Sequence, residues 1–254
     1  MSRIRMIKIL AAVAILFAVC QNFAWADDQT AANDLLDKAI KAQGGEAALA
    51  KIVGFEVNLK GTNFDGDNKV PSSTEITCQG YDKIMSLETN SDTKAETIEV
   101  VNGDDGWTKE GDKPAEAMND QQLKAQKHSM YMNWITTVLP FKEKGYKLTA
   151  IDEVLVAGKP AEGLLVSHKK REPVKLYFDK KSHLLVKTED SLVDADSGAK
   201  RTIVTIYADY KAVQGIQQPF KMKTYVDGVK VNESDVVDMK IHEKPIDERL
   251  FTKP

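Results

Sequence analysis

The sequence predicts an α+β fold dominated by antiparallel strands that curl into an open barrel or a strongly bent sheet. Two observations indicate this fold: many short segments in which apolar and polar residues alternate, and turn residues that separate these segments at regular spacing. A third observation is that helical periodicity is confined to two segments, one near the start of the chain and one in its middle. The sequence has no linker and no fixed-period repeat, so residues 27–254 are expected to form a single domain.

The first predicted element is an amphipathic helix. Its apolar positions recur at spacings that build one face, namely Leu35, Leu36, Ala39 and Ile40, followed by Gln43. Asn33 is the candidate N-cap. Gly44 and Gly45 end the helix, because glycine adopts the left-handed conformation of a C-cap without steric cost. A further short turn of helix is expected from Glu46 to Lys51.

The strand pattern begins around Phe55, where apolar and polar residues start to alternate. Gly61 to Pro71 is rich in turn residues and is predicted to be a loop. Asn102 to Gly106 is a strong hairpin signal. Further strands are predicted near Ser73–Gln79, Ile84–Glu88, Glu96–Val101, Tyr146–Val156, Ala161–His168, Val174–Asp179, Leu184–Glu189, Arg201–Tyr210, Phe220–Val226 and Val229–Ile241.

The middle of the chain supplies the candidate binding residues. Ala115 to Leu139 has helical spacing and predicts one long or two short helices, ended by Pro140. This stretch is rich in Met and aromatic side chains, which suit a site for flexible acyl chains because Met fills irregular space. The alternative is that they form the packed core. The candidate ligand-binding residues are Trp107, Met130, Met132, Trp134, Ile135, Val138 and Phe141.

The N-terminus has the pattern of a cleaved signal peptide. Basic residues at positions 3, 5 and 8 precede an apolar run from Ile9 to Val19, which at about 11 residues is too short to span a bilayer as a helix. Ala24, Trp25 and Ala26 form an A-x-A cleavage site, so residues 1–26 are expected to be removed and the protein to be periplasmic. Cys20 lacks the preceding residues of a lipobox, so lipidation there is not expected.

Composition excludes several classes of function. All 38 acidic residues follow Ala26 and three of the 35 basic residues precede it, so the mature chain has a net charge of −6 and no basic block for nucleic acid. The four histidines lack metal-ligand spacing, and Cys78 is the single cysteine after the cleavage site. Asp65 to Asn68 begins like a calcium loop, but the required Gly and Glu are missing.

Motifs for catalysis are also lacking, so no catalytic residue, metal or cofactor is predicted. The sequence has no nucleophile elbow, phosphate loop or dinucleotide fingerprint. A hydrolase with two carboxylates from distant strands stays open as an alternative, because such a pair has no local signature.

The order of the elements resembles a known family. A helix is followed by strands, by a hairpin at Val100–Trp107, by the central helices and by more strands. The clearest similarities are at Tyr177–Lys187, Tyr207–Phe220 and the C-terminal Ile246–Pro254. On these residues the chain resembles the LolA/LolB-like superfamily of outer-membrane lipoprotein-sorting proteins, as a divergent member, over nearly the whole mature length.

The resemblance implies an open, strongly curved antiparallel β half-barrel with helices covering the concave face as a lid. It also implies a non-catalytic periplasmic carrier or binding protein for a lipid or an acylated lipoprotein, monomeric and with transient membrane-protein partners. The lipoprotein carrier proper has an Arg-Pro pair where this chain has Gln79 to Ile84, which favours a divergent lipid-binding relative. The alternative is a periplasmic sensor or protein-interaction module on the same scaffold, with a partner bound at a sheet edge.

Overall fold

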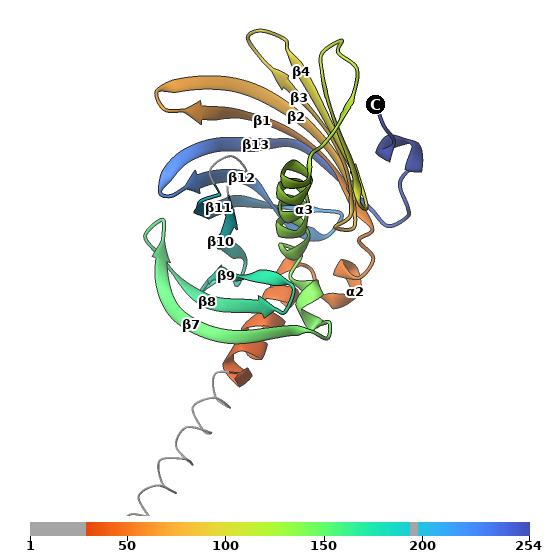
Figure 1. Cartoon of the computed structure of the whole chain (residues 1–254). Helices are drawn as coiled ribbons and strands as arrows, with labels where there is room; N and C mark the ends of the chain where they lie inside the picture. Colours follow the sequence, from red (N-terminus) through yellow and green to blue (C-terminus); the bar gives the residue numbers. More distant parts are fainter. Residues whose placement is uncertain (1–28, 194–197) are drawn as a thin grey trace, which may run out of the picture.

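The computed structural model describes residues 29–193 and 198–254, and it shows a strongly curved sheet with a helix inside its curve (Figure 1). The expectations for the signal peptide and for Cys20 fall on residues outside this described part. The helical elements are residues 29–43, α2 (Glu46–Leu49), α3 (Asp120–Ile135) and the 3-10 helices η1 (Leu139–Lys142) and η2 (Glu248–Phe251).

All strands of the described residues belong to one 13-stranded antiparallel sheet. They are β1 (Gly54–Asp65), β2 (Asn68–Gln79), β3 (Lys83–Asn90), β4 (Glu96–Asn102), β5 (Asp105–Glu110), β6 (Glu116–Ala117), β7 (Tyr146–Val156), β8 (Lys159–His168), β9 (Arg171–Asp179), β10 (Leu185–Val193), β11 (Lys200–Val213), β12 (Ile216–Val226) and β13 (Val229–His242). The order across the sheet is β6-β5-β4-β3-β2-β1-β13-β12-β11-β10-β9-β8-β7. This confirms the predicted α+β fold with an open, curved antiparallel sheet.

The topology explains why a helix crosses the concave face. The chain builds the sheet outward from β1 to the edge at β6, and it then resumes at the opposite edge with β7. The segment between these two edges contains α3 and η1, so it must pass across one face of the sheet. The last strand, β13, returns to pair with β1 at the centre, with Phe55 opposite Ile241.

Two packed clusters fill the two sides of the concave face. The larger cluster joins the helix of residues 29–43 to η1 and to β7–β9, with Leu36, Phe141 and Phe178 among its members. The smaller cluster joins α3 to β3 and β4 through Met130, Ile84 and Val101. Between them lie the central strands of the sheet, so the two clusters support α3 at its margins.

The first helix differs from its prediction at one end. Its buried residues are the predicted apolar face, and Gly45 N donates to Ile40 O at 2.8 Å where the helix ends. Gly44 and Gly45 both have positive φ, as a glycine C-cap requires. Asn33, the predicted N-cap, lies inside the helix, because residues 29–32 are already helical.

The predicted loop from Gly61 to Pro71 is wrong, because β1 and β2 continue through it to a turn at Gly66 and Asp67. Hydrogen bonds between polar side chains of neighbouring strands stabilise this part of the sheet. Asn232 Nδ2 donates to Asn63 Oδ1, and Asn63 Nδ2 donates to Glu88 Oε1, both at 2.7 Å.

The central helical segment is shorter than predicted. It begins at an Asn119 N-cap whose side chain accepts from Gln121 N and Gln122 N, and it ends at Ile135. Residues 116–117 form β6 instead of helix. Pro140 does not end a helix but lies in the first turn of η1, where its missing N–H needs no partner.

Candidate functional site

A cavity lies between α3 and the concave face of the sheet, and we call it the inner cavity. Its volume is about 480 Å³, which is within the range of about 300–1,000 Å³ that is typical of small-molecule sites. Its floor comes from six neighbouring strands, β2, β1, β13, β12, β11 and β10. Most of the floor is apolar and includes Phe55, Val57, Leu59, Met222, Val236 and Met239.

Strand and helix periodicity position this lining. Val57 and Leu59 follow Phe55 at every second residue of β1, so all three side chains share the concave face. The roof is one stripe of α3 at helical spacing, formed by Ala125, His128, Ser129, Met132 and Asn133, and it continues to the C-cap residue Thr136. A stripe that covered a dry core would be uniformly apolar, whereas this one mixes small, polar and Met side chains over an open space.

The inner cavity also contains a small set of buried polar groups. His128 Nε2 of α3 lies 2.5 Å from Asp190 Oδ2 of β10, and the Asp190 side chain is 3% exposed. Thr188 Oγ1 and Tyr207 OH lie 3.3 Å apart on the floor. Gln218 of β12 is 6% exposed, and its Nε2 has no hydrogen-bond partner among the described residues.

Formal charge in the inner cavity is limited to one pair of side chains. None of the described residues that line it is Lys or Arg, and its ionisable pair is His128 with Asp190. Burial raises the pKa of the Cys78 thiol to about 11 and the pKa of Tyr207 to about 12. Both groups are therefore neutral at physiological pH.

Polar contacts hold α3 on both sides of the inner cavity. On one side Gln126 Nε2 donates to Glu99 of β4, and burial raises the pKa of that carboxyl. On the other side the Arg171 guanidinium lies 3.8 Å from the Tyr131 ring centroid. Just after the helix, Gln43 Nε2 donates to Thr136 O at 3.0 Å.

The predicted binding residues are distributed over several environments. Met132 lines the inner cavity, and Met130 and Trp134 border a neighbouring hollow of about 30 Å³. Ile135, Val138 and Phe141 lie in the packed cluster with the first helix. Trp107 lies on β5, paired with Val100 of β4 and Ala117 of β6. Binding of a ligand by these residues stays a prediction.

Sequence reasoning missed the sheet floor of the cavity. The alternating residues of β1 and β13 were recognised as strands, but nothing in a single strand distinguishes a cavity wall from a core wall. One usable signal was present in the polar residues at inward positions, such as Thr205, Gln218 and Ser234. A dry core would contain fewer of them, because each needs a hydrogen-bond partner.

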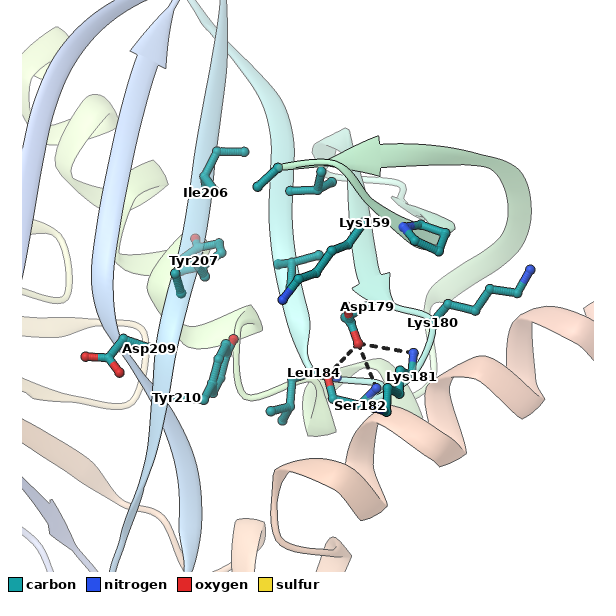
Figure 2. A pocket seen from close by; sticks show the side chains of 15 residues that line it. Lys159, Asp179, Lys180, Lys181, Ser182, Leu184, Ile206, Tyr207, Asp209 and Tyr210 are labelled. Carbon is teal, nitrogen blue, oxygen red and sulfur yellow. Dashed lines mark hydrogen bonds between the residues drawn. The ribbon is translucent and has the colours of Figure 1, made fainter.

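A second hollow, which we call the outer groove, lies on the opposite face of the sheet (Figure 2). Its volume is about 810 Å³. Ile206 and Ala208 line it and alternate along β11 with Thr205 and Tyr207 of the inner cavity, so the two hollows use opposite faces of that strand. Tyr207 borders both.

Charged residues of two hairpin turns border the outer groove. Asp179 Oδ1 accepts from Ser182 N at 2.7 Å, Ser182 Oγ at 2.9 Å and Lys181 N at 3.1 Å (Figure 2). The Ser182 backbone N–H is the main cause of a lowered pKa of Asp179. Lys180 Nζ lies 2.6 Å from Glu153 Oε2, and both side chains are well exposed. Lys180 and Glu153 are therefore largely solvated, and Asp179 is held by the hydrogen bonds of its own turn.

Neither a metal site nor a membrane-spanning helix is found in the described residues. No three His, Cys, Asp or Glu side chains between residues 29 and 254, leaving out 194–197, come together as a metal site would require. None of the helices in the described part of the chain has the length and hydropathy of a membrane-spanning segment.

Solved structures show which fold this is. No protein-family model matches the sequence, and no curated protein is significantly similar to it. A LolA superfamily protein from Nitrosomonas europaea matches with a TM-score of 0.57 at 15% identity, and a putative outer membrane lipoprotein-sorting protein domain from Vibrio parahaemolyticus with 0.53 at 11%. A DUF1329 family protein from Desulfovibrio piger matches with 0.56 at 10%. Each match covers 87% of this chain and 97% of the other.

The chain has the LolA-like fold. This confirms the fold that the resemblance implied. The motif that begins at Tyr177 forms the end of β9 and the β9–β10 turn, whose Asp179 accepts the bonds described above. The C-terminal motif forms η2, and its Phe251 is fully buried, with Phe251 O accepting from Asn102 Nδ2 at 3.2 Å. Two of the three similar stretches therefore form turns and strand ends, whereas Tyr207–Phe220 forms the β11–β12 hairpin and contributes Tyr207, Gln218 and Pro219 to the lining of the inner cavity.

Proposed function

We propose that the protein is a non-catalytic periplasmic carrier or binding protein whose inner cavity holds the acyl chain of a lipid or of an acylated lipoprotein. The observation that carries this proposal is a mainly apolar cavity of about 480 Å³ that the chain's own side chains do not fill. Burial of a ligand's chain in such a space is worth roughly 0.8 kcal/mol per CH₂. The LolA-like fold and the predicted leader support a role in outer-membrane lipid or lipoprotein sorting, as a monomer with transient membrane-protein partners.

The shape of the cavity supports an elongated ligand. Its wall along β12 extends from Gln218 to Thr224. The six residue steps between them span about 20 Å at a rise of about 3.3 Å per residue. A flexible chain suits this form better than a compact polar metabolite, because the wall offers a long apolar surface and few polar groups.

The attachment of α3 supports entry by movement of this helix. On the cavity side α3 contacts the sheet through the His128–Asp190 pair, and at its margin through Gln126 and Glu99. These polar contacts can exchange for water when the helix moves, and the cost of that movement comes from the apolar contacts of Met130, Tyr131 and Ile135 at the margins of α3. We therefore assign α3 the role of the lid.

The alternative of a protein-interaction module has less support from the sheet edges. The edge strand β7 carries a register irregularity between Ile151 and Val154, and the residues there are Asp152 and Glu153. Bulges and charged residues at an edge oppose the addition of a further strand. The cavity is thus the better-supported site.

The test fills the inner cavity. Val236 is 7% exposed and lines the floor, whereas its neighbour Val237 is 56% exposed. Val236→Trp should lower the affinity for an uncharged apolar probe, N-phenyl-1-naphthylamine, at least tenfold, while Val237→Trp leaves it unchanged. Native mass spectrometry of the purified mature protein should show a co-bound lipid in the wild type and in Val237→Trp. A wild type that binds neither probe nor lipid would sink the proposal.

A further inference from the structure

The outer groove is an apolar surface that no helix of the described chain lines. Val186 and Ile206 lie on its floor and pack against the buried cluster of Val156, Ala161 and Tyr177. Every described residue that lines the groove belongs to β7–β11 or to the turns between these strands, whereas α3 roofs the inner cavity. A small apolar ligand needs enclosure over most of its surface. An open floor of this kind therefore suits a segment of another protein, which covers the floor with its own chain.

The strand beside this floor has a distorted backbone. Asp209 has a φ of 54° in the middle of β11, where strand geometry requires negative φ, and the ladder to β12 is interrupted at this residue. The next residue, Tyr210, donates from its hydroxyl to Leu185 O of β10 at 2.5 Å and so holds the distorted strand in place. Non-glycine residues in this conformation gather at binding sites, because the rest of the fold must impose it. Asp209 lines the outer groove, which favours a binding role over a passive surface.

The charges that line the outer groove are unequally engaged. Of its five charged residues, Lys180 and Asp209 form ion pairs with neighbouring side chains, and Asp179 accepts the hydrogen bonds of its own turn. The other two are Lys159 and Lys181, and neither forms an ion pair with the described residues. Figure 2 shows the Lys159 side chain reaching into the groove from the β7–β8 hairpin. The uncommitted charges of the groove are therefore positive, and they complement an acidic partner.

We propose that the outer groove docks a segment of a partner protein that combines apolar and acidic residues. The apolar side chains of the segment lie on the floor, and its Asp or Glu residues pair with Lys159 and Lys181. Such charge pairs fix the register of the segment and exclude basic partners. The inference goes beyond the acyl ligand and does not depend on it, because the groove and the inner cavity use opposite faces of β11.

Phage display identifies the peptides that the outer groove prefers. A library of random peptides is selected on the immobilised mature protein. An excess of the soluble double variant Lys159→Glu with Lys181→Glu removes peptides that bind elsewhere. The selected peptides should combine apolar residues with Asp or Glu, and fluorescence anisotropy should show that the double variant binds them about tenfold or more weakly than wild type. Selection of basic peptides, or of none above background, would overturn the inference.

The matched control is the double variant Lys169→Glu with Lys170→Glu. It makes the same change of charge at exposed residues of the β8–β9 turn, which line neither hollow, so it should leave the affinity for the selected peptides unchanged. Val186→Thr keeps a β-branched side chain but makes the floor more polar, and it should weaken peptide binding about threefold. Circular dichroism melting curves check that every variant folds. An equal loss of peptide affinity in the two double variants would show that net charge, and not the groove, is responsible, and would overturn the inference.

Two further measurements exclude other occupants of the groove. A saturating selected peptide should leave the displacement of N-phenyl-1-naphthylamine by methyl dodecanoate unchanged, because that displacement reports on the inner cavity. Competition between the peptide and methyl dodecanoate would overturn the inference. Light scattering of the purified mature protein should give the mass of a monomer. A dimer that dissociates in Lys159→Glu with Lys181→Glu would assign the groove to a second copy of this chain, and would likewise overturn it.

Discussion

The inner cavity and the outer groove lie on opposite faces of β11 and differ in the number and exposure of the charged residues that line them. The groove is the larger, at about 810 Å³ against about 480 Å³, but it is bordered by exposed lysines and carboxylates that water already solvates. The cavity is lined by residues of six strands and one helix. Its described ionisable pair is His128 and Asp190, whose side chains contact each other. The chemistry of the lining, rather than the size of a hollow, therefore favours the inner cavity as the proposed acyl-binding site.

The largest expected difference between the two regions is in the strength of their ion pairs. His128→Ala should lower the free energy of unfolding by about 2–3 kcal/mol, because it removes the partner of a carboxylate that is 3% exposed. Lys180→Ala in the outer groove should cost less than about 1 kcal/mol, because Lys180 and Glu153 are 54% and 43% exposed. Urea denaturation of both variants measures these values.

Asp190→Asn is the control for the cavity pair. It keeps a hydrogen-bonding side chain opposite His128 and removes the buried negative charge, so it should destabilise less than His128→Ala. Equal stability of His128→Ala and Lys180→Ala would show that the pair under α3 is as solvated as the one in the groove.

A second difference should appear in the reactivity of thiols. Burial raises the pKa of Cys78 to about 11, so methyl methanethiolsulfonate should label it slowly at pH 7 and about tenfold faster for each unit of pH up to that value. Because Cys78 lines the inner cavity, saturation with methyl dodecanoate should slow the labelling at least about tenfold. Peptide mass spectrometry reads the modification at this residue.

Lys181→Cys supplies the matching thiol in the outer groove. It should react quickly at pH 8, and methyl dodecanoate should leave its rate unchanged. Protection of the groove thiol with no protection of Cys78 would reverse the assignment of the two hollows.

The sequence predicted the sheet better than the site, and the physical reason lies in the range of the interactions involved. Alternation and turn residues are local, so strands such as β7 at Tyr146–Val156 were found with their observed bounds. The extension of β1 past Gly61 was missed because it depends on cross-strand bonds of Asn63 to Glu88 and Asn232, which are distant in sequence. The polar end of that strand resembles a loop until its partners are known.

The candidate site shows the same limit more strongly. Met132 was predicted and lines the inner cavity, whereas Ile135 and Val138, from the same segment, lie in the packed cluster with the first helix. Whether an apolar side chain meets another or meets a space depends on which elements curl around it. Curvature arises from the whole sheet, so no spacing in the α3 segment could distinguish these residues.

A smaller difference concerns the response to acid. Burial raises the pKa of Glu99 beside α3, so its contribution to stability is greatest below its ordinary pKa of 4.5 and falls as pH rises through the raised value. The Ser182 backbone N–H lowers the pKa of Asp179 in the groove, so its contribution is complete above 3.8 and is lost as pH falls through the lowered value. The two carboxyls should therefore respond to pH with opposite sign.

Substitutions separate these two responses. Glu99→Gln should raise the melting temperature at pH 7 and have little effect at pH 4. Asp179→Asn should lower the melting temperature at pH 7 and have less effect at pH 3. Melting curves between pH 3 and pH 8 measure both, and a gain at pH 7 from Asp179→Asn would contradict the assigned bonds in the turn.

The smallest expected effect is the one that best distinguishes which of the two hollows binds the ligand. Lys159 and Lys181 line the outer groove, and neither lines the inner cavity. The double variant Lys159→Glu with Lys181→Glu reverses the charge of the groove border. If the cavity is the acyl site, the affinity for methyl dodecanoate should stay within twofold of wild type at 0.15 M salt, because exposed charges are screened over about 8 Å. A tenfold loss in the double variant, with the affinity of Val236→Trp unchanged, would instead place the ligand in the groove, since the substituted side chains would then contact the ligand.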